Sequence, residues 1–177
     1  MRMIAPMMLA GLALSAAGCA GEEAGSGGAG AVDLRSATGE TMARASVTQG
    51  ADGASVSIEA AGLQAGTYGV HVHTTGRCDA PAFESAGAHW NPTTRQHGTQ
   101  NPQGPHQGDL PNLTVGADGR GTVAFVIPGA QLTGGDAPMM DADGAAVVVH
   151  ADPDDYRTDP SGNSGARIAC GVLAASS

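Results

Sequence analysis

The stretch MARASVTQGADGASVSIE, residues 42–59, contains the pattern that decides the fold of this chain. Its two halves, Met42–Gln49 and Ala54–Glu59, mix apolar and β-branched residues with polar ones in short alternating runs, and Gly50-Ala51-Asp52-Gly53 lies between them. Alternating runs on either side of a turn that contains Gly and Asp are typical of a β-hairpin. This stretch therefore predicts a pair of antiparallel strands.

Similar short runs continue along the chain and are separated by Gly- and Asp-rich turns. No segment after the N-terminal region has the period of a helix, so we expect an all-β sandwich or barrel. Two segments, Thr74–Asp109 and Ala151–Ala166, carry no strand pattern, and loops of this length in a compact domain are usually functional. The further strands are predicted at Gly66–His73, Leu113–Val115, Gly121–Ile127 and Ala145–His150.

The N-terminus has the layout of a secretory signal peptide over residues 1–18, with Arg2 followed by an apolar stretch too short to span a membrane. The run SAAGC, which ends at Cys19, resembles a bacterial lipobox, so we expect Cys19 to become the acylated first residue. Ordinary cleavage that leaves Cys19 as a free thiol is the alternative. Gly-rich residues 19–31 are interpreted as a flexible tether and residues 32–177 as one domain, held in the periplasm on a membrane by the lipid alone.

The composition is acidic, with a formal net charge of −9 and eight basic residues, all of them arginine. This sign excludes a nucleic-acid binder, which needs a basic surface. If Cys19 is lipidated, Cys78 and Cys170 remain, and an even number of cysteines in an exported protein predicts a disulfide. Two free thiols are the alternative.

All six histidines lie between residues 71 and 150. His71 and His73 are two positions apart at the end of a predicted strand, so both side chains point to one face. Neutral imidazole is the commonest ligand of zinc and copper. Two four-coordinate sites need eight donors, and the histidines together with Asp109 supply seven, so one donor is shared or one site keeps a water. The sequence therefore predicts a two-metal site built from His71, His73, His89, His97, His106, Asp109 and His150.

Several segments, taken in order, resemble Cu,Zn superoxide dismutase across residues 32–173. They are GVHVH (69–73), GAHWNP (87–92), HG (97–98), PHQGDLPNL (105–113), VVVHADPDD (147–155) and GNSGARIACGVL (162–173). The resemblance implies an eight-stranded Greek-key β-barrel with two long functional loops. It also implies an enzyme that converts superoxide into oxygen and hydrogen peroxide.

The resemblance also implies a role for each site residue. Asp154 would tie a copper histidine to a zinc histidine from outside the coordination shell, whereas by itself it would be read as a solvated loop acid. Arg167 would receive superoxide beside copper, whereas by itself it would equally well neutralise neighbouring aspartates. Ser161 matches a small hydroxyl residue of the channel, and Cys78 and Cys170 match a disulfide that holds Arg167 in place. Copper would be held by His71, His73, His89 and His150, and zinc by His89, His97, His106 and Asp109, with His89 as the bridging donor.

The chain departs from the family pattern in two ways that concern substrate guidance. The segment Ala151–Ala166 is shorter than the charged loop of many members, and no lysine is available to guide superoxide. A non-catalytic copper or zinc binding or delivery protein is the alternative, for which Met139-Met140 is the one candidate copper(I) motif. A zinc-only, inactive relative is a third reading, against which the retention of His150 and Arg167 argues. The sequence predicts no oligomeric state.

Overall fold

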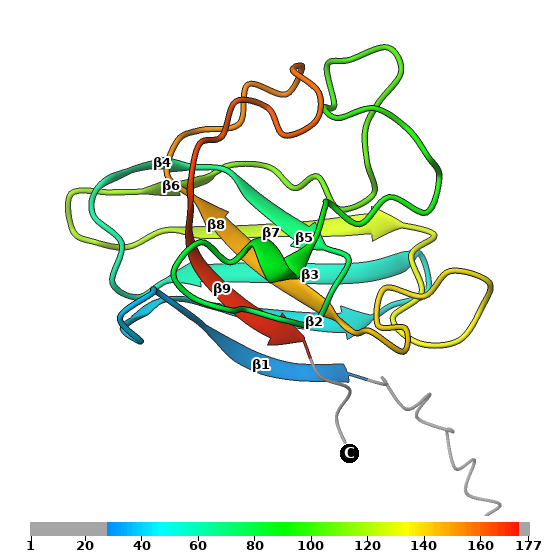
Figure 1. Ribbon diagram of the computed structural model, residues 1–177, viewed down its shortest axis with the longest axis horizontal. Helices are drawn as coiled ribbons and strands as arrows, with labels where there is room; N and C mark the ends of the chain where they lie inside the picture. Colours follow the sequence, from blue (N-terminus) through cyan, green and yellow to red (C-terminus); the bar gives the residue numbers. More distant parts are fainter. Residues whose placement is uncertain (1–27, 174–177) are drawn as a thin grey trace, which may run out of the picture.

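The computed structural model describes residues 28–173, which form nine strands and one short 3-10 helix (Figure 1). The predicted all-β fold is confirmed. The signal peptide and Cys19 lie outside the described residues. The elements are β1 Gly28–Arg35, β2 Thr41–Gln49, β3 Gly53–Ala60, β4 Gly66–Tyr68, β5 Val70–His73, the 3-10 helix η1 Glu84–Ala86, β6 Leu113–Val115, β7 Thr122–Pro128, β8 Ala145–His150 and β9 Arg167–Leu173.

The predicted hairpin is present, with β2 and β3 paired antiparallel from Gln49 opposite Ala54 along the ladder. The alternation has the expected physical cause, because Ala45 and Val47 are fully buried while their neighbours face outward. Gly53 closes the turn with a φ of 145°, and a Cβ there would lie 2.0 Å from the carbonyl oxygen of Ile127 on β7. Only glycine fits where the turn passes so close to the next strand.

The strands form a barrel because the long strand predicted at residues 66–73 is interrupted at Gly69 and pairs on two sides. Its first part, β4, pairs with β6, and its second part, β5, pairs with β8. The main sheet has the order β5-β8-β9-β1-β2-β3-β7, and β6 lies against β7. Counting β4 and β5 as one strand gives the eight-stranded Greek-key barrel that the resemblance implied.

Two strands were not predicted, β1 and β9. β1 begins at Gly28, inside the segment interpreted as a tether, and pairs with β2. β9 has Gly171 in its middle, where a Cβ would lie 2.6 Å from Leu34 Cδ2, so the close approach of β1 needs a glycine. β1 is half Gly and Ala, and β9 is a nearly continuous apolar run around Gly171, so neither gives a clear alternation.

The strand β8 is buried on both faces and separates two apolar clusters. Val147 and Val149 belong to the main core of the barrel. Ala146 and Val148 face the other way, where they pack with residues of the first long loop and with Cys170. The two long loops thus cover the outer face of β5 and β8, and the second of them lies next to the part of the first that follows η1 at the top of Figure 1. No helix within residues 28–173 is long and apolar enough to cross a membrane.

Candidate metal centre

The strands β5 and β8 supply three histidines to one buried cluster. His71 and His73 share the outer face of β5, as the sequence predicted, while Val70 and Val72 point into the core. His150 ends β8, and its N–H donates to the carbonyl of Gly69, 2.8 Å away. One donor atom from each of four histidines lies within 4.8 Å of the others, and the four are His71, His73, His89 and His150.

The first long loop reaches this cluster because its backbone is tied to the edge of β5. The N–H of Trp90 donates to Val72 O at 2.8 Å, and the N–H of Val72 donates to Gly108 O at 2.9 Å. Gly108 in turn donates to Trp90 O at 2.8 Å, and a Cβ on Gly108 would lie 2.4 Å from Val72 O. Two stretches of the loop, around residues 88–90 and 108–109, are therefore fixed beside β5. This brings His89 and Asp109 to the strand.

A second cluster forms around the carboxylate of Asp109. Its Oδ1 lies 2.9 Å from His89 Nδ1, 3.0 Å from His97 Nδ1 and 3.3 Å from His106 Nδ1. Its Oδ2 accepts the backbone N–H groups of Gly98 and His106 at 2.9 and 3.0 Å, which turns Oδ1 toward the imidazoles. Burial alone would raise the pKa of Asp109, but the hydrogen bonds from His106, His89 and His97 hold it well below its usual range. Asp109 is therefore a carboxylate.

Asp154 links the two clusters. Its Oδ2 accepts from His71 Nε2 at 2.8 Å and its Oδ1 accepts from His97 Nε2 at 3.0 Å, and its side chain is fully buried. Asn112 holds the Asp154 backbone on both sides, because Asn112 Nδ2 donates to Asp154 O at 2.9 Å and Asp154 N donates to Asn112 Oδ1 at 2.8 Å. Asp154 is therefore not a solvated loop acid. The role of Asn112 was not predicted, although it lies in the quoted segment 105–113.

Burial keeps the histidines of the first cluster neutral, because the charged imidazolium loses its hydration there. It lowers the pKa of His71 to about 3, of His73 to about 2 and of His150 to about 4. His97 differs, because its hydrogen bonds to Asp109 and Asp154 outweigh burial and raise its pKa to about 9. Metal ligation needs neutral imidazole, which the first cluster already provides.

Three ring nitrogens of the first cluster are buried without a hydrogen-bond partner, and they are His71 Nδ1, His73 Nε2 and His150 Nε2. The opposite nitrogen of each ring is engaged, with Asp154, with Gly87 O at 3.0 Å and with Gly165 O at 3.3 Å respectively. Buried polar atoms without partners are rare and call for a specific explanation. A metal ion bound by these three lone pairs fits the arrangement, and the hydrogen bonds to Asp154, Gly87 O and Gly165 O already orient the rings.

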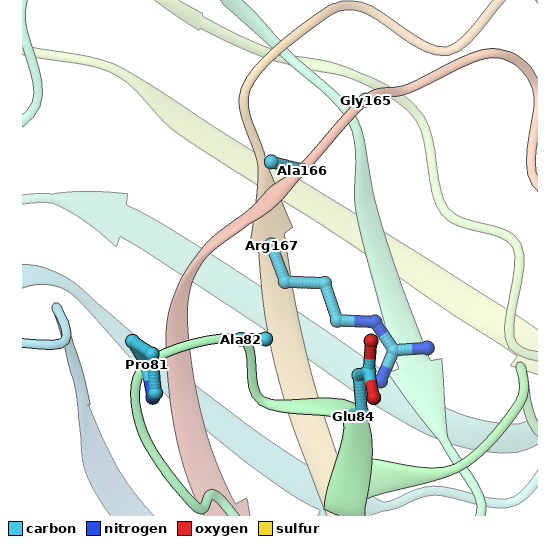
Figure 2. Close-up of a pocket in the computed structure, with 6 residues that line it drawn as sticks. All are labelled: Pro81, Ala82, Glu84, Gly165, Ala166 and Arg167. Carbon is cyan, nitrogen blue, oxygen red and sulfur yellow. The ribbon is translucent and has the colours of Figure 1, made fainter.

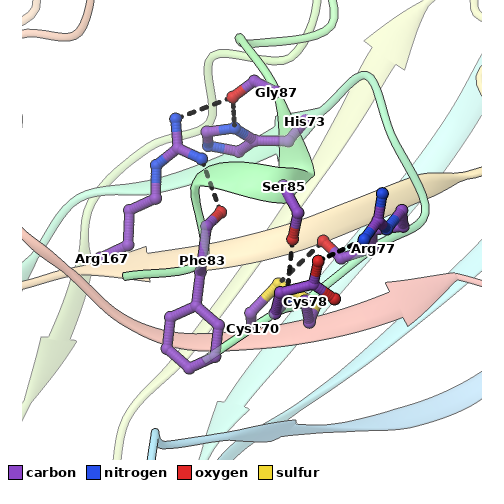
Figure 3. Close-up of a disulfide and its surroundings, with 9 residues drawn as sticks. His73, Arg77, Cys78, Phe83, Ser85, Gly87, Arg167 and Cys170 are labelled. Atoms are coloured by element: carbon purple, nitrogen blue, oxygen red, sulfur yellow. Dashed lines mark hydrogen bonds and ion pairs between the residues drawn. A yellow bond between two sulfur atoms is a disulfide. The ribbon is translucent and has the colours of Figure 1, made fainter. Parts of the chain in front are cut away.

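Arg167 is held by backbone carbonyls of the first long loop (Figure 3). Its Nη1 donates to Phe83 O at 2.8 Å and its Nη2 donates to Gly87 O at 2.7 Å, and Gly87 O also accepts from His73 Nδ1. It makes no ion pair with a carboxylate in the described part of the chain, so it does not neutralise the neighbouring aspartates. The predicted disulfide between Cys78 and Cys170 is confirmed and joins this loop to β9, the strand that carries Arg167.

The metal centre opens into a cavity of about 450 Å³ that Arg167 lines. An adjoining cavity of about 470 Å³ is also lined by Arg167, and Figure 2 shows the exposed carboxylate of Glu84 next to the guanidinium there. Ser161 lies at the first cavity, as expected for a channel residue, whereas Arg95 was not predicted to lie there. The first cavity is lined by Ala88, His89, Asn91, Arg95, His106, His150, Asp159, Pro160, Ser161, Gly165 and Arg167.

Comparisons with known proteins agree with this geometry. A model of the copper/zinc superoxide dismutase family matches residues 41–173. Superoxide dismutase-like protein YojM of Bacillus subtilis is 48% identical over 69% of this chain and 63% of its own length, so the chain spans just under two thirds of that relative. The Cu-Zn superoxide dismutase of Caulobacter vibrioides is 41% identical over 79% of this chain and 82% of its own length. This chain belongs to the copper/zinc superoxide dismutase family.

A solved structure of a similar protein has the same fold. It is a double mutant of a SOD-like protein from Bacillus subtilis, in which a tyrosine and a proline are replaced by histidines. It superposes with a TM-score of 0.77 at 43% identity, over 83% of this chain and 98% of its own. Membership of the family confirms the predicted cofactors, copper and zinc, which the two buried donor clusters fit. The predicted enzyme class, an oxidoreductase, is that of the relatives named superoxide dismutase.

Proposed function

We propose that this chain catalyses the disproportionation of superoxide into oxygen and hydrogen peroxide at a copper–zinc site. The observation that carries the proposal is the set of buried, unpartnered nitrogens on His71, His73 and His150, beside which His89 is placed. Copper tolerates a site of imidazole nitrogens with an open position. These four histidines are therefore the copper ligands in the proposal.

The zinc ligands in the proposal are His89, His97, His106 and Asp109. The second set whose donor atoms all lie within 4.8 Å of one another has His71 in place of His106, but His71 Nε2 is bonded to Asp154 and its Nδ1 belongs to the proposed copper donors. His106 Nδ1 instead lies 3.3 Å from Asp109 Oδ1 and 3.4 Å from His89 Nδ1, which favours His106.

His89 is the bridging residue in the proposal. Its Nδ1 faces Asp109 in the second cluster, while its ring stacks on His71 of the first cluster with the centroids 3.9 Å apart. The other four imidazole centroids lie between 4.9 and 6.2 Å from that of His89. This central position supports the proposal that the His89 imidazole offers one ring nitrogen to each metal.

Copper, when bound, supplies the one-electron redox change, and zinc keeps a single oxidation state. The protein's own side chains have three further tasks, which belong to Arg167, His89 and Asp154. Arg167 presents a fixed positive charge at the cavity, where burial lowers its pKa without removing its charge and Glu84 opposes that shift. His89 Nε2 is the atom that would hold the proton needed by the peroxide product. Asp154 keeps His71 and His97 in position.

The alternative of a copper delivery protein is disfavoured by the position of its candidate copper(I) motif, Met139-Met140. Met139 is 1% exposed and packs in the main core, and Met140 packs against the same core. Thioethers buried in this way are not presented for transfer of copper(I). The zinc-only reading is disfavoured by the unpartnered nitrogens of His73 and His150, which lie outside the zinc set.

The direct test is the rate of superoxide removal by the purified protein loaded with zinc alone and with copper and zinc, measured by stopped-flow. Turnover by the copper–zinc form and none by the zinc form is expected. Fully loaded protein that removes superoxide no faster than the zinc form refutes the proposed enzyme. Transfer of its copper to a chelator at a rate comparable with that of free copper would then favour delivery.

We also propose that the protein is exported and anchored through Cys19 in the periplasm. The Cys78–Cys170 disulfide supports an oxidising compartment. The lipobox-like run SAAGC is the support for the lipid.

A further inference from the structure

The family's substrate is an anion, whereas this chain carries a net charge of −9 and no lysine. Long-range attraction by the whole molecule is therefore unfavourable, and any attraction must come from local cations at the cavity. The positions of the arginines decide which positively charged side chains are available at the cavity.

Three of the arginines in the described chain are paired with aspartates on the surface. Arg35 and Arg44 both bind Asp33, at 2.6 and 3.0 Å, and Arg77 binds Asp79. Their charges are compensated locally. Of the remaining four, Arg157 donates through Nε to Gln100 at 2.9 Å, and Arg120 lies in the turn between β6 and β7. Only Arg95 and Arg167 line the metal cavity.

Arg95 is held in place without a carboxylate partner. Its backbone N–H donates to Asn91 Oδ1 at 3.0 Å, and Asn91 Nδ2 donates to Arg95 O at 2.8 Å. Its Nη1 donates to Gly104 O at 2.6 Å. In the described chain, its Nε and Nη2 make no hydrogen bond and it has no ion pair, so its charge remains directed to the cavity and the solvent.

The negative charges near the cavity offset the positive charge of Arg167. Glu84 lies beside Arg167 and weakens the field of that guanidinium (Figure 2). Asp159 also lines the cavity, although its Oδ1 accepts the N–H of His97 at 2.6 Å and so faces the loop. With Arg167 as the only cation, the side chains at the opening of the cavity would carry no net positive charge.

We propose that Arg95 is a second anion-guiding residue, which attracts superoxide into the metal cavity from the first long loop. The inference rests on the proposed function. Arg95 acts by its charge at a distance and is not a ligand of either metal. A unit charge about 10 Å from the path of an anion, at a dielectric constant between those of protein and water, changes the encounter rate about two- to fourfold.

The experiment compares Arg95→Gln, Arg95→Lys and, as a matched control for the loss of one positive charge, Arg120→Gln in copper- and zinc-loaded protein. At low ionic strength Arg95→Gln should lower kcat/KM for superoxide about two- to fourfold and flatten its dependence on salt. Arg95→Lys should restore most of the rate and slope, and Arg120→Gln should match the wild type.

Two outcomes overturn the proposal. One is an unchanged rate and salt slope in Arg95→Gln. The other is a loss of zinc in both Arg95 variants, because it would mean that the bond to Gly104 O braces the loop and that the charge itself has no role. Zinc content is therefore measured in every sample.

A titration with inorganic phosphate separates this inference from the proposed function. Phosphate is an anion whose binding to the loaded protein can be followed by ³¹P line broadening without any turnover. Weaker binding in Arg95→Gln than in Arg120→Gln supports the guiding role even if superoxide is not a substrate. Equal binding in the two variants refutes it.

Discussion

Replacing Gly162 by alanine should disrupt the carboxylate that connects the two metal clusters. Gly162 has a φ of +65°, and a Cβ there would lie 1.9 Å from Asp154 Oδ1 and 2.7 Å from His97 Nε2. Asp154 cannot step aside freely, because its side chain is fully buried and accepts from His71, His97 and the N–H of Tyr156 at 2.8, 3.0 and 2.6 Å. The added methyl group must therefore displace the Asp154 carboxylate from its position between His71 and His97.

The expected loss of folding stability follows from the hydrogen bonds that the displacement breaks. A carbon–oxygen contact needs about 3.3 Å, so the carboxylate must move by more than 1 Å and lose its bonds to the imidazoles. Hydrogen bonds to charged groups contribute about 1.5–3 kcal/mol each, and two of them amount to about 3–6 kcal/mol. The left-handed backbone adds about 1–2 kcal/mol. Gly119→Ala is the matched control, since Gly119 has a φ of +74° and an added Cβ would meet nothing within 4 Å.

The assay is urea unfolding of the metal-free proteins, together with zinc content after dialysis. Gly162→Ala should be about 3–6 kcal/mol less stable than Gly119→Ala and should lose zinc, because His97 is no longer oriented. Equal stability and equal zinc retention in the two variants would show that the carboxylate moves without consequence. The argument that Asp154 couples the two clusters would then be wrong.

Four further predictions follow from the site. His150→Ala should remove copper and activity while sparing zinc, and Asp109→Ala should release zinc first. Metal analysis and turnover measurements check both variants. Full copper content and a full rate in both would refute the ligand assignment. Arg167→Ala should lower the second-order rate about tenfold with metal content unchanged, and a rate and salt slope equal to those of the wild type in stopped-flow would contradict this. The metal-free protein should lose stability as pH falls below 6.5, by at most about 1.4 kcal/mol per pH unit for each of the four histidines whose folded pKa is lowered by burial, since the unfolded chain binds more protons there. Denaturant unfolding at several pH values checks this, and a flat profile between pH 6.5 and 5 would refute it. Cys19→Ser should abolish lipid attachment and leave a functional domain, and a wild-type mature N-terminus other than Cys19 in mass spectrometry would refute the anchor.

Local periodicity predicted those parts of the fold in which one face of a strand is buried. The β2–β3 hairpin and the placement of His71 and His73 on one face follow from a period of two, and both are present. The strands β1 and β9 were not predicted, because the Gly and Ala residues of β1 and the nearly continuous apolar run of β9 leave no alternation to detect. Family membership and the disulfide were also predicted from the sequence and are confirmed, whereas the export and lipid assignments remain predictions.

The sequence by itself thus determined which residues have the chemistry for the site, since seven donors in a span without other histidines allow few arrangements. The division of these donors between copper and zinc stays a prediction, and only the tertiary structure decided what holds them in place. The loop is fixed by backbone hydrogen bonds to the edge of β5, and apart from the glycine that the close approach requires at residue 108 these bonds leave no side-chain pattern in the sequence. Likewise, Asn112, Gly162 and Arg95 matter because of contacts with segments far away in the chain, and no local pattern records which segments will meet.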